Sequence, residues 1–122
     1  MIPKFRAWDK RFSEFVEDFF VSEDGKIYKK TKDTGYGVAI SRETSDKIIL
    51  MQSTGLNDLN GVEIFEGDIV RFFDSLYTVF YDIKEGSYRL KPHDDRWVVD
   101  YMCNFSSEET LEVVANIYEN KE

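Results

Sequence analysis

Residues 50–70, LMQSTGLNDLNGVEIFEGDIV, constrain the fold more than any other part of the chain, because a polar corner separates two apolar runs there. Glycine and asparagine tolerate left-handed backbone, and threonine or aspartate side chains accept hydrogen bonds from nearby amides. We therefore predict a strand, a tight corner at 54–61 and the start of a second strand. The residues expected to shape this corner are Thr54, Gly55, Asp58, Asn60 and Gly61.

The sequence Glu66-Gly67-Asp68 leads directly into the apolar run at 69–73. Glycine permits a sharp bend into a strand, and a Gly-Asp pair before an apolar strand is typical of small SH3-like barrels. Gly67→Val should therefore destabilise the fold strongly if this position has a positive φ. We also expect Asp68 to bond backbone at the strand start, and Asp58 to cap the preceding corner.

The C-terminal half is expected to continue as short antiparallel strands, because aromatic and β-branched residues favour strands and 16% of the chain is aromatic. A tight turn is predicted at Asp74-Ser75, and a hairpin loop at 82–87 with Gly86 in the left-handed region. Residues 97–102 fit a short strand or an irregular apolar segment. Ser106, followed by acidic residues, suits the N-cap of one helical turn. Further strands are expected at 4–8, 48–51, 76–81, 88–91 and 111–118.

Residues 12–20 carry two conflicting patterns. Phenylalanine and valine recur there at the spacing of an amphipathic helix. In contrast, Asp24-Gly25 between two β-prone runs favours a hairpin turn. We predict a hairpin over 17–31 and leave a helical turn at 12–16 open. The polar stretch 31–47 is expected to form a mobile loop or a weak edge strand.

The predicted fold class is mainly β: a small bent antiparallel sheet or SH3-like barrel at about 50–118, with an added N-terminal β-hairpin layer and one or two helical turns. We expect a single domain over residues 1–122, in which 1–47 form the hairpin subdomain and 48–120 the barrel-like part.

Charge and cysteine content limit the setting of the protein. A formal charge of −8 repels polyanions such as nucleic acid and anionic lipid. The single cysteine, Cys103, cannot form an internal disulfide, which fits a reducing compartment. No apolar run approaches the length that spans a bilayer, and residues 1–8 do not have the apolar run of a signal peptide. We expect a cytoplasmic protein.

The sequence predicts no catalytic residues, no metal site and no cofactor. The sole histidine, His93, precedes Asp94-Asp95, and three consecutive side chains on an extended strand cannot all face one ion. Cys103 lies between aromatic residues and is expected to be a small apolar filler. No nucleophile elbow, phosphate loop or dinucleotide fingerprint occurs.

One stretch could bind nucleic acid. Lys26, Lys29, Lys30 and Lys32 surround Tyr28, and small barrels bind single strands through basic and aromatic side chains. Tyr36, between two glycines of the polar stretch, could add a contact. Acidic residues beside this hairpin and the overall charge oppose this interpretation. The same charge suits a decoy that occupies a DNA-binding protein.

Several ordered sequence pieces resemble the YopX family of phage and prophage proteins. They are KFRAWD at 4–9, which contains Trp8, LMQSTGL at 50–56, NG at 60–61, IFEGDIV at 64–70 and EVVANIYEN at 112–120. Phe65 stands where most members have tyrosine, and Ala115 where most have glycine. The resemblance implies a mostly-β fold, a phage or prophage origin and expression in the bacterial cytoplasm. It implies no reaction.

The function hypothesis is a non-catalytic binding module whose partner is another protein or a second copy of the chain. Exposed strand edges and aromatic side chains favour association. The alternatives are nucleic-acid binding through the hairpin at 26–32 and an acidic decoy.

Overall fold

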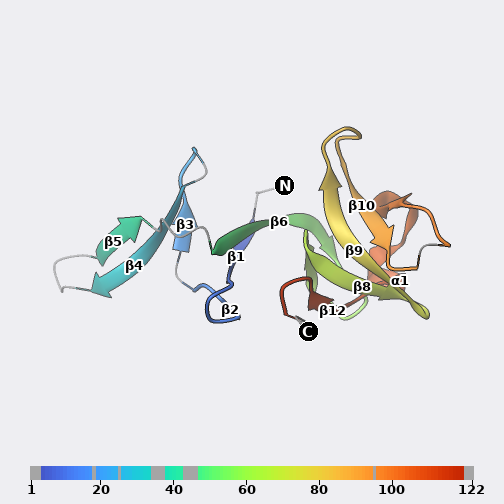
Figure 1. Ribbon diagram of the computed structural model, residues 1–122, viewed down its shortest axis with the longest axis horizontal. Coiled ribbons are helices and arrows are strands. Elements are labelled where there is room, and N and C mark those ends of the chain that lie inside the picture. Colours follow the sequence, from blue (N-terminus) through green and yellow to red (C-terminus); the bar gives the residue numbers. More distant parts are fainter. Residues whose placement is uncertain are drawn as a thin grey trace. The chain divides into compact units, whose positions relative to one another are not determined.

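The computed structural model describes residues 4–17, 19–24, 26–33, 38–42, 47–94 and 96–119, and it is mostly β (Figure 1). The first six strands are β1 (Phe5–Asp9), β2 (Glu14–Phe15), β3 (Phe19–Val21), β4 (Ile27–Asp33), β5 (Val38–Arg42) and β6 (Ile48–Asn57). The other strands are β7 (Glu63–Phe65), β8 (Asp68–Phe72), β9 (Ser75–Asp82), β10 (Ser87–Pro92), β11 (Asp100–Tyr101) and β12 (Glu112–Asn116). A 3₁₀ turn, Met102–Asn104, and a one-turn helix, α1 (Ser107–Thr110), lie between β11 and β12. The predicted fold class is confirmed.

The chain divides into two compact units, one comprising Ala7–Leu50 and the other Met1–Arg6 with Met51–Glu122. Strands β1 and β6 contribute residues to both units. The described residues form three sheets, with strand orders β2-β1-β6-β7, β11-β10-β9-β8-β12 and β3-β4-β5. Within the described residues, no helix is long and apolar enough to cross a membrane.

The five-stranded sheet curls into a half-barrel around the core of its unit (Figure 1). Strand β9 shows how the sequence dictates this arrangement. Tyr77 and Val79 are buried while their neighbours are more exposed, because successive side chains of a strand point to opposite faces. The buried core cluster consists of Ile64, Val70, Tyr77, Val79, Leu90, Met102 and Leu111.

The mid-chain corner is shorter than predicted. Strand β6 continues to Asn57, passing through Gly55 at φ 80°, and its register with β7 shifts between Ser53 and Asn57. The corner therefore begins at Asp58, and Gly61, which tolerates left-handed backbone, has a φ of 79°. Asn60 does not adopt the left-handed conformation, because the glycine beside it takes that position.

Asp58 connects the corner to the last strand. One carboxylate oxygen, Oδ1, accepts hydrogen bonds from the backbone N–H groups of Asn60 and Val62, each at 2.8 Å. The other oxygen, Oδ2, accepts one from the N–H of Val113 at 2.8 Å, 55 residues along the chain. The side chain is buried. Asp58 therefore caps a turn, as predicted, and also holds β12.

Gly67 has a positive φ of 85°, so the condition set for the valine substitution is met. Its N–H donates to the carbonyl of Val79 and its carbonyl accepts from the N–H of Ile117, both at 2.8 Å. A β-carbon built on Gly67 would lie 3.0 Å from the sulfur of Met51. Both backbone conformation and space therefore favour glycine at this bend.

Asp68 bonds backbone at the start of β8, as predicted. Its Oδ2 accepts from the N–H of Phe65 at 2.8 Å, and its Oδ1 pairs with the guanidinium of Arg6. Burial raises the pKa of the Asp68 carboxyl above the ordinary value of 3.8, and the Arg6 charge opposes this effect. The local environment therefore favours the protonated form more than water does.

The raised pKa of Asp68 predicts how stability depends on pH. Between the unfolded pKa of 3.8 and the higher folded pKa, the folded chain binds more protons than the unfolded chain. The contribution of this group to stability therefore increases as the pH falls through the folded pKa. We expect the free energy of unfolding of the wild type, relative to Asp68→Asn, to increase from about pH 7 to about pH 4 in urea titrations. A decrease would show that the Arg6 pair outweighs burial.

Residues 12–16, for which a helical turn was left open, lie in the unit formed by Ala7–Leu50 and are not helical. They form a turn and strand β2 instead of a helix, with Ser13 at φ 52°. Trp8 pairs with Phe15 across β1 and β2, and the two rings meet edge-to-face at 4.8 Å. Trp8 is buried. This cross-strand aromatic contact replaces the predicted helical face.

The hairpin predicted over 17–31 is present as β3 and β4, with Phe20 opposite Tyr28. Gly25 lies outside the described residues. Strand β5 extends the sheet as an edge strand within the polar stretch 31–47, while 34–37 and 43–46 are also outside the described residues. The edge-strand alternative therefore holds for Val38–Arg42.

Three predictions in the C-terminal half need correction or refinement. The turn after β8 comprises Phe73 and Asp74 instead of Asp74-Ser75, and Phe73 has φ 54°. Of residues 97–102, only Asp100–Tyr101 form a strand. Ser106 precedes α1 as predicted, but its side chain makes no capping bond, and its carbonyl accepts the amides of Glu109 and Thr110. The loop with Gly86 at φ 65° is confirmed.

Candidate functional site

Of the residues proposed for nucleic-acid contact, Tyr28, Lys29 and Lys30 lie on β4 of the β3–β4 hairpin. Tyr28 stacks on Phe20 with ring centroids 5.5 Å apart and ring planes at 11°. Lys29 and Lys30 occupy the next two positions of β4, opposite Ser41 and Ile40 of β5. Their side chains and Tyr36 lie outside the described part of the structure. Of these residues, the described geometry therefore places the side chain of Tyr28, which stacks on a ring that was not predicted, Phe20.

The polar side chains singled out at the mid-chain corner make hydrogen bonds to the backbone. The Thr54 hydroxyl donates to the carbonyl of Ile64 at 2.8 Å and accepts from the N–H of Leu56 at 3.1 Å. The carboxylates of Asp58 and Asp68 bond different amides, and neither bonds the other's partners. These side chains hold turns in place and do not converge on one cleft.

Candidate metal and nucleophilic residues are also separated. Among the described residues, no group of three His, Cys, Asp or Glu side chains could hold a metal ion. The ring of His93 bonds the hydroxyl of Thr78, with Nε2 and Oγ1 2.8 Å apart. Cys103 is exposed, so its predicted role as an apolar filler is wrong. The 3₁₀ turn buries Met102 instead and leaves the cysteine outside.

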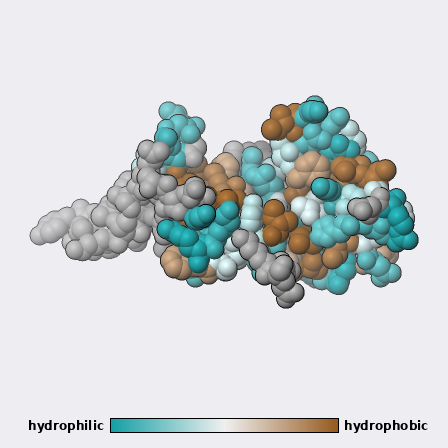
Figure 2. All heavy atoms as spheres, in the orientation of Figure 1, coloured by the Kyte–Doolittle hydropathy of each residue, from teal (hydrophilic) through white to brown (hydrophobic). Residues whose placement is uncertain are grey.

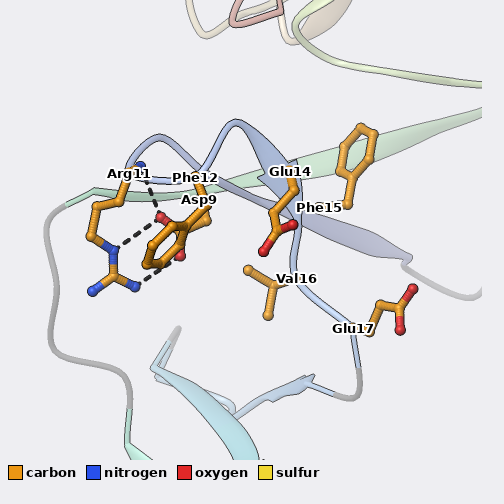
Figure 3. Close-up of a pocket in the computed structure, with 7 residues that line it drawn as sticks. All are labelled: Asp9, Arg11, Phe12, Glu14, Phe15, Val16 and Glu17. Carbon is orange, nitrogen blue, oxygen red and sulfur yellow. Dashed lines mark hydrogen bonds and ion pairs between the residues drawn. The ribbon is translucent and has the colours of Figure 1, made fainter.

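A hollow of about 380 Å³ lies in the Ala7–Leu50 unit, on the turn after β1 (Figure 3). The carboxylate of Asp9 accepts from the backbone N–H and the guanidinium of Arg11, at 2.8–3.0 Å. The same guanidinium lies 5.4 Å from the ring centre of Phe12. Arg11 is therefore already engaged by its own turn. The hollow is lined by Asp9, Arg11, Phe12, Glu14, Phe15, Val16 and Glu17.

A second hollow, of about 450 Å³, lies in the half-barrel unit and is lined by four aromatic rings. We call it the aromatic groove; its lining residues are Phe72, Tyr77, Trp97, Asp100, Asn104, Phe105, Ser106 and Thr110. The ring of Phe105 meets Phe72 edge-to-face at 5.1 Å and Tyr77 at 5.9 Å. These contacts fix one wall of the groove against the core.

Exposed apolar side chains lie in the groove lining or next to lining residues in the chain. Trp97, which lines it, is 56% exposed, and Val98 and Phe73, beside lining residues in the chain, are 81% and 80% exposed. Figure 2 shows apolar residues interrupting the polar surface in the part of the molecule formed by β8 to β10. Large exposed aromatic and aliphatic groups around a concave surface are typical of binding sites.

Two residues that line the groove carry polar groups that can accept hydrogen bonds from a bound ligand. Tyr77 is only 8% exposed, and no described residue bonds its hydroxyl. The Asp100 carboxylate uses Oδ1 to accept from the N–H of Tyr101 at 2.7 Å and from Nδ2 of Asn104 at 2.6 Å. No described residue bonds Oδ2 of Asp100. A tyrosine hydroxyl and a carboxylate oxygen therefore both have capacity for further hydrogen bonds.

Arg89 fixes the segment that carries Trp97. Its guanidinium bonds Asp82 at 2.9 Å and the carbonyl of Val99 at 3.2 Å, and it lies 4.5 Å from the ring centre of Tyr101. The hydrogen bond from Arg89 lowers the pKa of the Asp82 carboxyl and raises the pKa of Arg89 itself. One charged side chain therefore joins the β9–β10 hairpin to the chain between Trp97 and β11.

Sequence reasoning did not identify the aromatic groove. Its lining residues come from β8, β9 and the segment between residues 97 and 110, which meet only through the fold. The available signal was the apolar run at 97–102, which was expected to be a strand or an irregular segment. The exposed residues Trp97 and Val98 indicate a binding site only when the structure shows which other aromatic rings lie beside Trp97.

Comparison with known proteins gives a family and a fold. The family model described as YopX protein matches residues 4–122. No curated protein matches the chain significantly. Among solved structures, protein EF1440 from Enterococcus faecalis is 28% identical with a TM-score of 0.61, covering 98% of this chain and 96% of that one. Protein yopX from Bacillus subtilis is 17% identical with a TM-score of 0.59, covering 95% and 93% respectively, and supports the fold.

Proposed function

The chain belongs to the YopX family, and from that premise we propose that it is a phage- or prophage-encoded accessory protein that binds a partner without catalysing a reaction. We place the contact at the aromatic groove and the site of action in the cytoplasm of the bacterial host. The phage setting follows from what the family resemblance implies. The proposal that the protein binds a partner rests on the aromatic groove.

The observation that carries the proposal is the exposure of Trp97 and Val98 at the groove. Burying apolar surface stabilises a complex by about 25 cal/mol per Å² before the costs of association. Aromatic side chains are also enriched at the centres of protein interfaces, where a few of them supply most of the affinity. A partner that covers Trp97 would remove this surface from water.

Capture of a partner from bacteria that express the chain tests the proposal. We expect a specific protein, identified by mass spectrometry, to be enriched with the wild type and lost with Trp97→Ala. Ile83→Ala serves as the matched control, because Ile83 is 86% exposed in the β9–β10 loop and does not line the groove. Equal capture by all three proteins, or no enrichment in repeated experiments, would contradict the proposal.

Nucleic-acid binding is a second candidate, supported by the stacked pair of Phe20 and Tyr28 beside Lys26. Exposed aromatic faces stack with bases, and lysines neutralise phosphates. A labelled single-stranded oligonucleotide should then bind at low salt, with an affinity that falls as salt increases. Tyr28→Ala should weaken this binding, whereas Trp97→Ala should not. Absence of binding at low salt would eliminate this candidate.

A further inference from the structure

We propose that the aromatic groove takes an arginine or lysine side chain from a basic segment of a different protein. This inference deepens the proposed function and rests on it. Three observations support a cationic occupant: the aromatic walls, the polar groups with spare hydrogen-bonding capacity, and the absence of basic residues from the described lining. Each of them is independent of the others.

The walls of the groove suit a cation. Phe72, Tyr77, Trp97 and Phe105 all line the same hollow. The faces of aromatic rings carry partial negative charge, so a guanidinium or ammonium group within about 6 Å of a ring centre is attracted to it. The protein already uses this interaction elsewhere, because Arg89 lies over Tyr101 and Arg6 over Phe65 at 4.5 and 4.6 Å.

The polar groups of the groove match the donors of such a side chain. Arginine and lysine donate hydrogen bonds and accept none. Tyr77 and Asp100 both line the groove. No described residue bonds the Tyr77 hydroxyl or Oδ2 of Asp100, and both atoms can accept hydrogen bonds. A basic side chain would therefore donate a hydrogen bond to the hydroxyl and pair with the carboxylate.

The charge around the groove favours a basic partner. An adjoining hollow of about 400 Å³ shares Phe105 and Ser106 with the groove and is lined by Glu108 and Glu109. Among the described residues, neither hollow is lined by a lysine or an arginine. With the formal charge of −8, this arrangement attracts cationic segments and repels nucleic acid and anionic lipid.

Fluorescence anisotropy with a labelled peptide tests the inference on the full chain. The probe is a ten-residue peptide with two arginines and two lysines, and its neutral counterpart carries citrulline and norleucine instead. We expect the basic peptide to bind at least about tenfold more tightly than the neutral peptide. Trp97→Ala should weaken binding of the basic peptide about tenfold, and Tyr77→Phe by a smaller factor.

Matched variants separate the groove from the general negative charge. Asp100→Asn and Asp74→Asn remove the same charge, but Asp74 lies in the exposed turn after β8 and does not line the groove. We expect Asp100→Asn to weaken binding several-fold more than Asp74→Asn. Ile83→Ala should leave it unchanged. Thermal melting of each variant confirms that the fold is retained.

The outcomes distinguish this inference from the proposed function. Equal weakening by Asp100→Asn and Asp74→Asn, or equal binding of basic and neutral peptides, would overturn the cationic occupant while leaving the groove as a partner site. Dimerisation of the chain that Trp97→Ala abolishes would assign the groove to a second copy and overturn the inference. Equal partner capture by the wild type and the groove variants would instead refute the proposed function.

Discussion

Asp58→Ala is expected to lower the free energy of unfolding by about 2–4 kcal/mol. The wild-type carboxylate accepts hydrogen bonds from three backbone N–H groups, those of Asn60, Val62 and Val113. Alanine leaves all three without this partner and also empties a buried position. Urea denaturation monitored by circular dichroism would measure the loss. The effect is large because one side chain holds both the corner and strand β12.

Two variants calibrate this prediction. Asp74→Ala removes an exposed aspartate for which no hydrogen bond is seen, and it should change stability by less than about 0.5 kcal/mol. Asp58→Asn keeps the shape but replaces one acceptor oxygen with a donor that faces a backbone N–H. It should therefore recover only part of the loss. Equal stability of Asp58→Ala and Asp74→Ala would contradict the role given to Asp58.

Gly67→Val is expected to cost a similar amount, about 3–4 kcal/mol, for two reasons that can be separated. At φ 85° a β-branched side chain is strained, and its β-carbon would lie 3.0 Å from the sulfur of Met51. Both neighbouring backbone bonds, to Val79 and Ile117, resist relaxation of this bend. Melting temperature and urea midpoint would both fall.

The comparison for Gly67 is Gly86→Val. Gly86 also has a positive φ, 65°, but a β-carbon there would meet no atom within 4 Å. Its cost should therefore reflect conformation alone, about 1–2 kcal/mol. If the two valine variants lose the same stability, crowding against Met51 contributes nothing. If Gly67→Val melts like the wild type, the bend does not require glycine.

Local chemistry made the bends of the half-barrel predictable. Gly86 was expected in the left-handed region, and Gly61 and Gly67 were expected at bends that glycine permits, because only glycine enters this region without strain. All three have positive φ. The turn after β8 was predicted one residue too late, because the same rule gave no reason to place a bulky residue in the left-handed region. Phe73 adopts φ 54°, which a sequence gives no ground to expect for a bulky aromatic residue.

Long-range contacts were beyond local reasoning. The sequence indicated that Asp58 would cap nearby amides, but its bond to Val113 depends on how β12 returns to the corner. Similarly, helical spacing at 12–16 was overridden by the pairing of Phe15 with Trp8. In both cases tertiary contacts decided the outcome, and a single sequence does not show them.

The aromatic groove was unpredictable for a related reason. Phe72 and Tyr77 come from adjacent strands, whereas Trp97 and Phe105 come from a segment without regular alternation. Composition alone indicated an aromatic-rich protein. Which aromatic rings enter the core and which remain exposed depends on the curl of the sheet and on the bond from Arg89 to the carbonyl of Val99.

Nuclear magnetic resonance titration of the ¹⁵N-labelled chain with the basic peptide tests most directly whether the aromatic groove is a binding site. The side-chain N–H signals of Trp97 and Asn104 report on the groove, and the indole of the buried Trp8 provides an internal control. We predict the largest shifts at Trp97 and Asn104, with the Trp8 signal unchanged. Shifts that concentrate on the β3–β4 hairpin, or that leave Trp97 unaffected at saturation, would contradict the account.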